Sequence, residues 1–301
     1  MVMNADYAAD RRRLKRRLGL WRVVAVLAVV ALAVILLARE QVVGRDHVAR
    51  LTVQGLILED RDRNRTLEAV AVDRRARALL VYIDSPGGTV VGGESLYHGL
   101  RRVAEHKPVV AVMGGVATSA AYMTAIASDH IIGREGTITG SIGVILQTTD
   151  VTGLLEKLGI EAESIKSGPY KAQPNPLEEF SPEARETVAA VIMDIHEMFV
   201  DLVEARRPLT RDEVTTLADG RIFTGRQAIA AGLIDALGSE KAARAWLASE
   251  HDVAATLPVR DLRVGGPERY LRDMLSATLG KTVFSEILKL DGLISVWHLG
   301  R

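Results

Sequence analysis

Apolar runs that alternate with amphipathic segments dominate the chain from residue 48 onward. Strand-like patterns cover residues 48–53, 79–83, 109–113 and 131–132. Segments with helical periodicity lie between them, at residues 67–76, 90–103 and 120–127. Strands that alternate with helices at this spacing predict an α/β fold with mostly parallel strands.

The second half of the chain carries recognisable helix starts. Ser181 followed by Pro182 predicts a long helix, whose apolar residues recur every three or four positions. Capping-box patterns predict two shorter helices, which begin after Thr210 and Thr224. Residues 266–301 are expected to form a helical extension, because their apolar residues are spaced as on an amphipathic helix.

An apolar stretch near the amino terminus is long enough to cross a membrane. Residues 18–38 are interrupted only by Arg22 and span roughly 31 Å as a helix. The segment 1–17 before them is strongly basic, and the positive-inside rule therefore places it in the cytoplasm. A cleavable signal peptide is the alternative, but residues 36–40 offer no convincing cleavage site. We expect a single-pass protein of the inner or plasma membrane, with lipid around residues 18–38 and the following domain outside the cytoplasm.

The distribution of charge excludes one class of partner. The chain has 38 Lys and Arg against 38 Asp and Glu, so its formal net charge is zero. Residues 1–38 carry +5, which leaves −5 on residues 39–301. A nucleic-acid-binding domain presents a cluster of basic residues, and no such cluster follows residue 38. We therefore expect no nucleic-acid partner, and the lack of cysteine excludes disulfides and thiolate chemistry.

Candidate chemistry stands at the ends of two predicted strands. Ser119 follows the run 109–113 and opens a helix of small residues, whose first amides could stabilise an oxyanion. The structural alternative is that Ser119 only caps this helix. The segment 84–88 after the preceding strand, Asp-Ser-Pro-Gly-Gly, predicts a turn whose glycines let a substrate backbone approach. The absence of a Gly-x-Ser-x-Gly motif disfavours an ordinary α/β-hydrolase.

A serine nucleophile needs a base, and Lys171 is the candidate in this sequence. A lysine can deprotonate serine only where burial away from carboxylates lowers its pKa from about 10.4 toward neutrality. The six residues on either side of Lys171 include no Asp or Glu. Lys157 and Lys166, by contrast, follow acidic neighbours and are expected on the solvated surface.

Taken in order, seven motifs resemble the signal peptide peptidase family of the Clp-protease and crotonase superfamily. They cover the part of the chain between about residue 48 and residue 240. The motifs are Pro86-Gly87-Gly88, Ala117-Thr118-Ser119-Ala120-Ala121-Tyr122, Thr139-Gly140-Ser141-Ile142-Gly143-Val144, Leu155-Glu156-Lys157-Leu158-Gly159-Ile160, Ser167-Gly168-Pro169-Tyr170-Lys171, Asp219-Gly220-Arg221-Ile222-Phe223-Thr224-Gly225 and Ala231-Gly232-Leu233-Ile234-Asp235.

The resemblance implies a Clp-protease/crotonase-like domain of repeated ββα units that acts as a serine endopeptidase without a metal or cofactor. It makes Ser119 the nucleophile and Lys171 the general base of a Ser/Lys dyad, with Ser141 orienting the lysine amine. Gly88 and Ala120 would donate the N–H groups of the oxyanion hole. Where the family commonly has glycines, Ala120 and Ala121 follow Ser119, so their methyl groups are expected to narrow the space around it.

The resemblance also implies hydrophobic peptide substrates, such as cleaved signal peptides, and a ring-shaped or dome-shaped homo-oligomer. The predicted organisation is a basic cytoplasmic segment (1–17), a transmembrane anchor (18–38), the protease domain (39–265) and the helical extension (266–301).

Several other functions are weighed against this one. A Ser-His-Asp protease would need His130 or His196 as its base, and both are better explained as structural residues. A crotonase-type acyl-CoA enzyme would leave Ser119 and Lys171 unexplained. A related membrane protease with particular membrane-protein partners, and a catalytically silent membrane scaffold, both stay open.

Overall fold

The computed structural model describes residues 21–22, 24–30, 45–265 and 294–296. The chain divides into two compact units, Met1–Asp46 and His47–Arg301. In the first unit residues 21–22 and 24–30 are helical, and most of the predicted anchor lies outside the described residues. Within the part that the structure describes, no helix is both long enough and apolar enough to cross a membrane.

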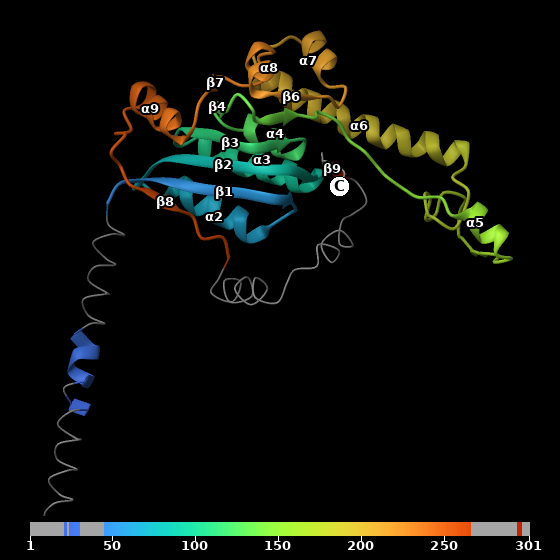
Figure 1. Cartoon of the computed structure of the whole chain (residues 1–301), viewed down its shortest axis with the longest axis horizontal. Coiled ribbons are helices and arrows are strands. Elements are labelled where there is room, and N and C mark those ends of the chain that lie inside the picture. The colour runs from blue at the N-terminus through green and yellow to red at the C-terminus, as the bar shows by residue number, and fades with distance from the viewer. Residues whose placement is uncertain (1–20, 23, 31–44, 266–293, 297–301) are drawn as a thin grey trace, which may run out of the picture. The chain divides into compact units, whose positions relative to one another are not determined.

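A mostly parallel sheet organises the second unit (Figure 1), as the sequence pattern predicts. Strands follow the path β6-β5-β3-β2-β1-β8, while β4 pairs with β3 and β7, and β9 pairs with β2. Only β6 and β9 run antiparallel to their neighbours among the described strands. The strands are β1 (His47–Ile57), β2 (Ala76–Thr89), β3 (Val109–Thr118), β4 (His130–Gly133), β5 (Ile138–Gly140), β6 (Ile222–Thr224), β7 (Ala236–Leu237), β8 (Val259–Asp261) and β9 (Ile294–Val296).

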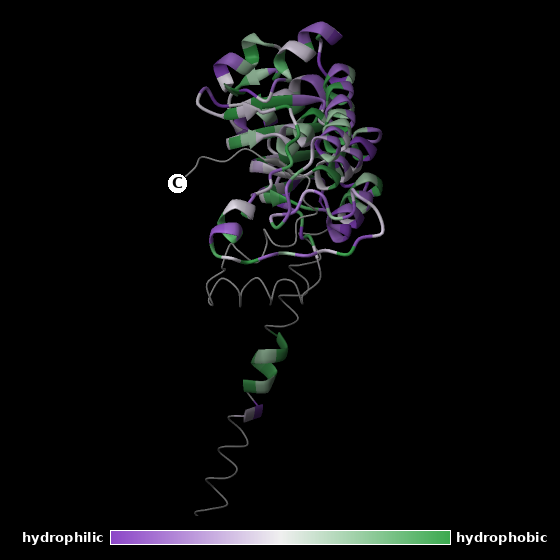
Figure 2. Cartoon of the chain, turned by 90° about the vertical axis from the view of Figure 1, so that its right-hand side faces the viewer, coloured by the Kyte–Doolittle hydropathy of each residue, from purple (hydrophilic) through white to green (hydrophobic). Residues whose placement is uncertain are grey.

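Helices cover both faces of this sheet. On one face the side chains of Leu79, Val81 and Ile83 enter the larger core, which helices α2, α3, α4 and α6 share. On the other face Ala78 and Leu80 pack with residues of α9. Burial on both faces explains why these strands read as continuous apolar runs (Figure 2). The helices are α2 (Arg61–Val72), α3 (Val90–Ala104), α4 (Ala120–Ile126), α5 (Thr152–Lys157), α6 (Pro182–Arg206), α7 (Arg211–Leu217), α8 (Gly225–Ala230) and α9 (Glu240–His251).

The capping patterns are confirmed, whereas several element boundaries differ from the prediction, and residues 294–296 of the expected helical extension form strand β9. Ser181 caps α6, and reciprocal capping boxes begin α7 and α8. The helix expected at 67–76 is α2, which ends at Val72, because residues from Ala76 onward pair with β1. The turn expected at 84–88 is wrong: β2 continues to Thr89, since β1 and β3 hold its two edges.

Residues 144–181, which we call the arm, extend away from the sheet and return through the first turns of α6 (Figure 1). Within the arm, the N–H of Val151 donates to the carbonyl of Pro176 at 3.0 Å, and Lys166 pairs with Glu178. This pairing corrects the expectation of a solvated Lys166, and it lowers the pKa of Glu178 to about 2. Several large apolar side chains of the arm are exposed, namely Leu154, Leu158, Ile160, Ile165, Tyr170 and Leu177.

Candidate active site

Ser119 lies at the abrupt turn from β3 into α4 and is only 1% exposed. Its backbone has φ 58° and ψ −122°, a region that L-residues rarely occupy. Its N–H donates to the carbonyl of Gly140 at 2.8 Å, and its carbonyl accepts from Met123 at 2.9 Å. The turn is therefore strained and firmly held on both sides.

The capping interpretation of Ser119 is wrong. Its side chain makes no cap hydrogen bond with the first amides of α4. Thr89 and Ser181 show the ordinary arrangement, with extended backbone and a side-chain oxygen that accepts an amide of the following helix. Ser119 differs from them in both respects, and this leaves the first amides of α4 without a side-chain cap from the residue before them.

The methyl groups after Ser119 are buried in the core. Ala120 and Ala121 are both 0% exposed. A Cβ built on Gly93 of α3 would lie 2.9 Å from the Cβ of Ala120, so the methyl of Ala120 faces Gly93. The methyl of Ala120 therefore packs against a glycine on the neighbouring helix.

Ser141 is brought close to Ser119 by two neighbouring parallel strands. Thr118 at the end of β3 is in register with Gly140 at the end of β5. Each serine directly follows one of these paired residues, and the N–H of Ser119 donates to Gly140. Ser141 has a positive φ of 51°, and its own N–H donates to the carbonyl of Arg221 at 2.8 Å.

Gly88 lies in β2, the strand beside β3, and the hydroxyl of Thr118 donates to the carbonyl of Pro86 at 3.1 Å. A side chain at Gly88 would place its Cβ 1.9 Å from the carbonyl oxygen of Ile57, so only glycine fits here. The backbone of β1 approaches Gly88 this closely, so the glycine is required for packing of the two strands. Gly88 and Ala120 thus stand on adjoining elements on the Ser119 side of the sheet.

Asp84 and Ser85 stabilise the same region. One carboxylate oxygen of Asp84 accepts the N–H groups of Gly115 and Val116, both at 3.1 Å. The hydroxyl of Ser85 donates to the carbonyl of Gly55 at 2.6 Å. Both side chains therefore link β2 to its neighbours where the register shifts, and neither is placed as a catalyst.

Strand β9 pairs with the end of β2 that lies next to Ser119. One edge of β2 pairs with β1 as far as Gly88, so β3 and β9 must share the other edge. On that edge β3 pairs as far as Ser85, and β9 pairs antiparallel from Gly87 to Thr89. Residues 294–296 thus follow β3 along β2, at the point where β3 turns into Ser119.

Lys171 is not brought to Ser119 within one chain. It lies on the arm, between α5 and α6, in a segment well separated from the β3–α4 turn (Figure 1). Its side chain is exposed, and its N–H donates to the carbonyl of Gly168 at 3.2 Å. The next residue, Ala172, has a positive φ of 62°. The structure therefore assembles Ser119, Ser141, Gly88 and Ala120, and leaves the predicted base on the arm.

Neither histidine stands where a base for Ser119 would be. His130 pairs with Val110 at the other end of β3, about 30 Å from Ser119 along the strand. Its ring stacks on Trp246 at 4.6 Å, and burial lowers its pKa. A ring nitrogen of His196 forms a 2.8 Å hydrogen bond with the carbonyl of Ala218. The structural interpretation of both residues is supported.

Sequence reasoning missed the role of Gly93 and of two arginines, Arg101 and Arg206, at the far end of α4. A pair of glycines inside a predicted helix, Gly92-Gly93, is a signal of close packing that could have pointed to Gly93. No local pattern could have found the arginines, because they reach α4 from helices that are distant in sequence.

Comparison with known proteins gives the family. Residues 101–254, just over half of the chain, match the model of peptidase family S49. A putative protease of Synechocystis is 43% identical over 207 residues, which cover 68% of this chain and 74% of that protein. A putative signal peptide peptidase of Enterococcus faecium is 29% identical over 213 residues, which cover 66% of this chain and 62% of that protein.

Among solved structures, a ClpP1 mutant from Listeria monocytogenes aligns with 63% of this chain and 91% of its own, at 14% identity and a TM-score of 0.40. The α/β assignment rests on the sheet topology of this chain itself. The matches of family and relatives confirm the resemblance that the sequence motifs indicate. The chain belongs to peptidase family S49, together with SppA-type serine peptidases.

Proposed function

We propose that this protein is a membrane-anchored serine endopeptidase with a Ser/Lys dyad, Ser119 and Lys171, that degrades hydrophobic peptides such as signal-peptide remnants. The observation that carries the proposal is the strained backbone of Ser119 at the start of α4, where its side chain makes no cap hydrogen bond with that helix. Residues 18–38 would hold the protein in the membrane, with the peptidase domain outside the cytoplasm. The relative named as a putative signal peptide peptidase supports this substrate class.

In the proposed reaction, the Ser119 hydroxyl attacks the peptide carbonyl and passes its proton to the Lys171 amine. The N–H groups of Gly88 and Ala120 stabilise the oxyanion, and Ser141 orients the amine. The protonated lysine then gives its proton to the leaving amine, and water hydrolyses the acyl-enzyme. The edge of β2 that accepts β9 at Gly87–Thr89 supports binding of the substrate as an extended strand.

We further infer that Lys171 reaches Ser119 from a second copy of the chain in a homo-oligomer. Three features support this inference: Lys171 is exposed, the arm carries it away from the sheet, and apolar side chains on the arm lie open to solvent. A lysine acts as a base where burial favours its neutral form. A contact that buries the arm against another copy would supply that condition.

A mixing experiment tests both parts of the proposal. Ser119→Ala and Lys171→Ala should each abolish cleavage of a short peptide with a small apolar residue before the cut. If Lys171 acts across the interface, a co-assembled equal mixture of the two variants should restore about a quarter of the sites. An inactive mixture of two properly assembled variants would place both groups in one chain, and a fully active Ser119→Ala variant would refute the peptidase mechanism.

The alternative function is a catalytically silent membrane scaffold with the same fold. Labelling of the nucleophile separates this scaffold from the peptidase. Wild-type chain should react with a serine-directed fluorophosphonate and Ser119→Ala should not.

A reporter fused after Arg301 tests the topology, since it should be active outside the cytoplasm.

A further inference from the structure

The nucleophile helix α4 ends inside the protein. Its last residue, Ile126, and the following Ala127 are both 0% exposed, and Ser128 is 4% exposed. The final carbonyl groups of a helix have no partner within that helix, and a buried carbonyl that stays unpaired is destabilising. Something outside α4 must therefore satisfy these carbonyls.

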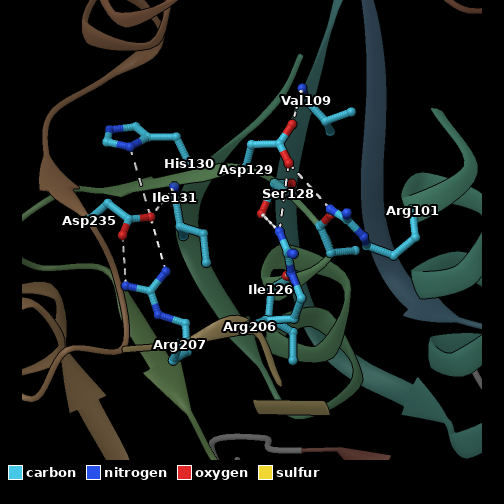
Figure 3. A network of polar contacts seen from close by, with 11 residues as sticks. Arg101, Val109, Ile126, Ser128, Asp129, His130, Ile131, Arg206, Arg207 and Asp235 are labelled. Carbon is cyan, nitrogen blue, oxygen red and sulfur yellow. Dashed lines mark hydrogen bonds and ion pairs between the residues drawn. The ribbon is translucent and has the colours of Figure 1, made fainter. Parts of the chain in front are cut away.

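Two arginines from other helices do so (Figure 3). Arg206, the last residue of α6, donates from Nε to the carbonyl of Ile126 and from Nη2 to that of Ser128, both at 3.1 Å. Arg101 of α3 donates from Nη1 to the carbonyl of Ala127 at 2.9 Å. Three consecutive carbonyls at the end of α4 are thus held by two guanidinium groups.

Asp129 connects the two arginines to the start of β3. One of its oxygens lies 3.3 Å from Arg101 Nη1 and 3.6 Å from Arg206 Nη2. The other accepts the N–H of Val109, the first residue of β3, at 3.0 Å. This cluster of Arg101, Arg206 and Asp129 therefore holds the far ends of both elements that meet at Ser119.

The chemistry of Arg206 suits this role better than that of a generic surface cation. Burial lowers its pKa, Arg101 beside it contributes in the same direction, and Asp129 opposes both. A planar guanidinium can donate to two carbonyls at once, in a fixed geometry that a lysine amine cannot reproduce. The retained cation thus fixes the orientation of the helix end.

We propose that Arg206 is a positioning residue for the nucleophile turn, an inference that rests on the proposed function. Helix α4 has seven residues, so its two ends are only about 10 Å apart. All seven residues are buried, so the helix is packed along its whole length. A shift at Ile126 is transmitted to Ser119 and to the N–H of Ala120, and a misplacement of about 1 Å can lower the rate on the order of a hundredfold.

The test compares Arg206→Gln and Arg206→Lys with Arg211→Gln in the full chain. Arg211 is the matched control, because it pairs with Glu197, Asp201 and Glu204 on α6 and makes none of the carbonyl contacts with α4. Fluorophosphonate titration counts the reactive sites, and rapid mixing with a peptide ester gives the acylation rate per site. Thermal unfolding is followed in parallel, so that all rates are measured on folded protein.

We expect Arg206→Gln to lower the acylation rate per titrated site at least tenfold with little change in KM, and Arg206→Lys to lose less. Arg211→Gln should keep the wild-type rate. If an Arg206 variant melts earlier but its folded sites acylate at the wild-type rate, Arg206 is only structural and the inference is overturned. Should Arg206→Gln not fold, Arg206→Lys decides by the same criterion. A wild-type chain that the phosphonate does not label would instead overturn the proposed function itself.

Discussion

Removing the side chain of Ser119 in two steps should expose the strain in its backbone. Ser119→Ala deletes the hydroxyl but keeps Cβ, while Ser119→Gly deletes both. Because the position has φ 58° and ψ −122°, only the glycine variant can occupy it without steric cost. Strain of this kind is worth about 1–3 kcal/mol per residue.

Two ordinary effects of glycine oppose the relief of strain. Glycine destabilises a regular element by about 0.5–1 kcal/mol relative to alanine. The lost methyl, fully buried here, removes about 0.8 kcal/mol of burial. Ala121→Gly suffers both effects and relieves no strain, because Ala121 lies within α4 with no positive φ and is equally buried. The difference between the two positions therefore isolates the strain.

Urea unfolding of the full chain in detergent, followed by circular dichroism, gives the free energy of unfolding of each protein. Two differences in the free energy of unfolding are compared: that between Ser119→Ala and Ser119→Gly, and that between wild type and Ala121→Gly. The first should be more favourable to the glycine variant than the second by about 1–3 kcal/mol. Equal changes at the two positions would mean that the turn carries no strain, and the interpretation of Ser119 as a functionally constrained residue would lose its physical basis.

Three further predictions concern the surroundings of this turn. Gly93→Ala would place a methyl 2.9 Å from that of Ala120, so the free energy of unfolding should fall by about 1–3 kcal/mol. Adding Ala120→Gly should restore most of this loss. If the effects of the two substitutions simply add, the two positions are not in contact. Deleting residues 266–301, which include β9, should raise kcat/KM for a short peptide because the β2 edge at Gly87–Thr89 becomes accessible, whereas an unchanged kcat/KM would argue against competition at that edge. Burial lowers the pKa of His130, so the folded state binds fewer protons there than the unfolded state. The free energy of unfolding should therefore decrease as pH falls below about 6.5. The urea midpoints at pH 7.5 and 5.5 should differ less in His130→Gln than in wild type.

Periodicity was sufficient for the sheet and for most helices because burial pattern and hydrogen bonding agree there. Residues 109–113 read as a buried strand, and both faces of β3 are indeed covered by helices. The same reasoning failed at residues 84–88, where Pro86 and two glycines suggested a turn. Pairing with β1 on one edge and with β3 and then β9 on the other keeps this segment extended, and such long-range pairing leaves no local signal.

The site was only partly accessible to sequence reasoning, for a similar reason. Ser119 and Ser141 directly follow parallel strands and Gly88 lies at the end of a neighbouring one, so their meeting at one side of the sheet could be expected from a parallel topology. The accommodation of the Ala120 methyl by Gly93 depends on how closely α3 and α4 pack, and the sequence does not state that distance. The position of Lys171 depends on the path of the arm, which has no buried residue and hence no strong periodicity.

The distribution of backbone strain argues for an enzyme over a silent scaffold. Four non-glycine residues have positive φ within the described ranges: Ser119, Ser141, Ala172 and Asp252. Asp252 ends α9 in the left-handed conformation that often terminates a helix, so it needs no functional explanation. The other three are the proposed nucleophile, the residue proposed to orient the base, and the neighbour of the proposed base. Strain persists where selection for function outweighs its cost in stability, and a scaffold would gain stability by replacing these residues with glycine. Ser119 and Ser141 directly follow neighbouring strands, and Ala172 lies beside the proposed base on the arm. This distribution supports the proposal that both parts of the chain serve one reaction.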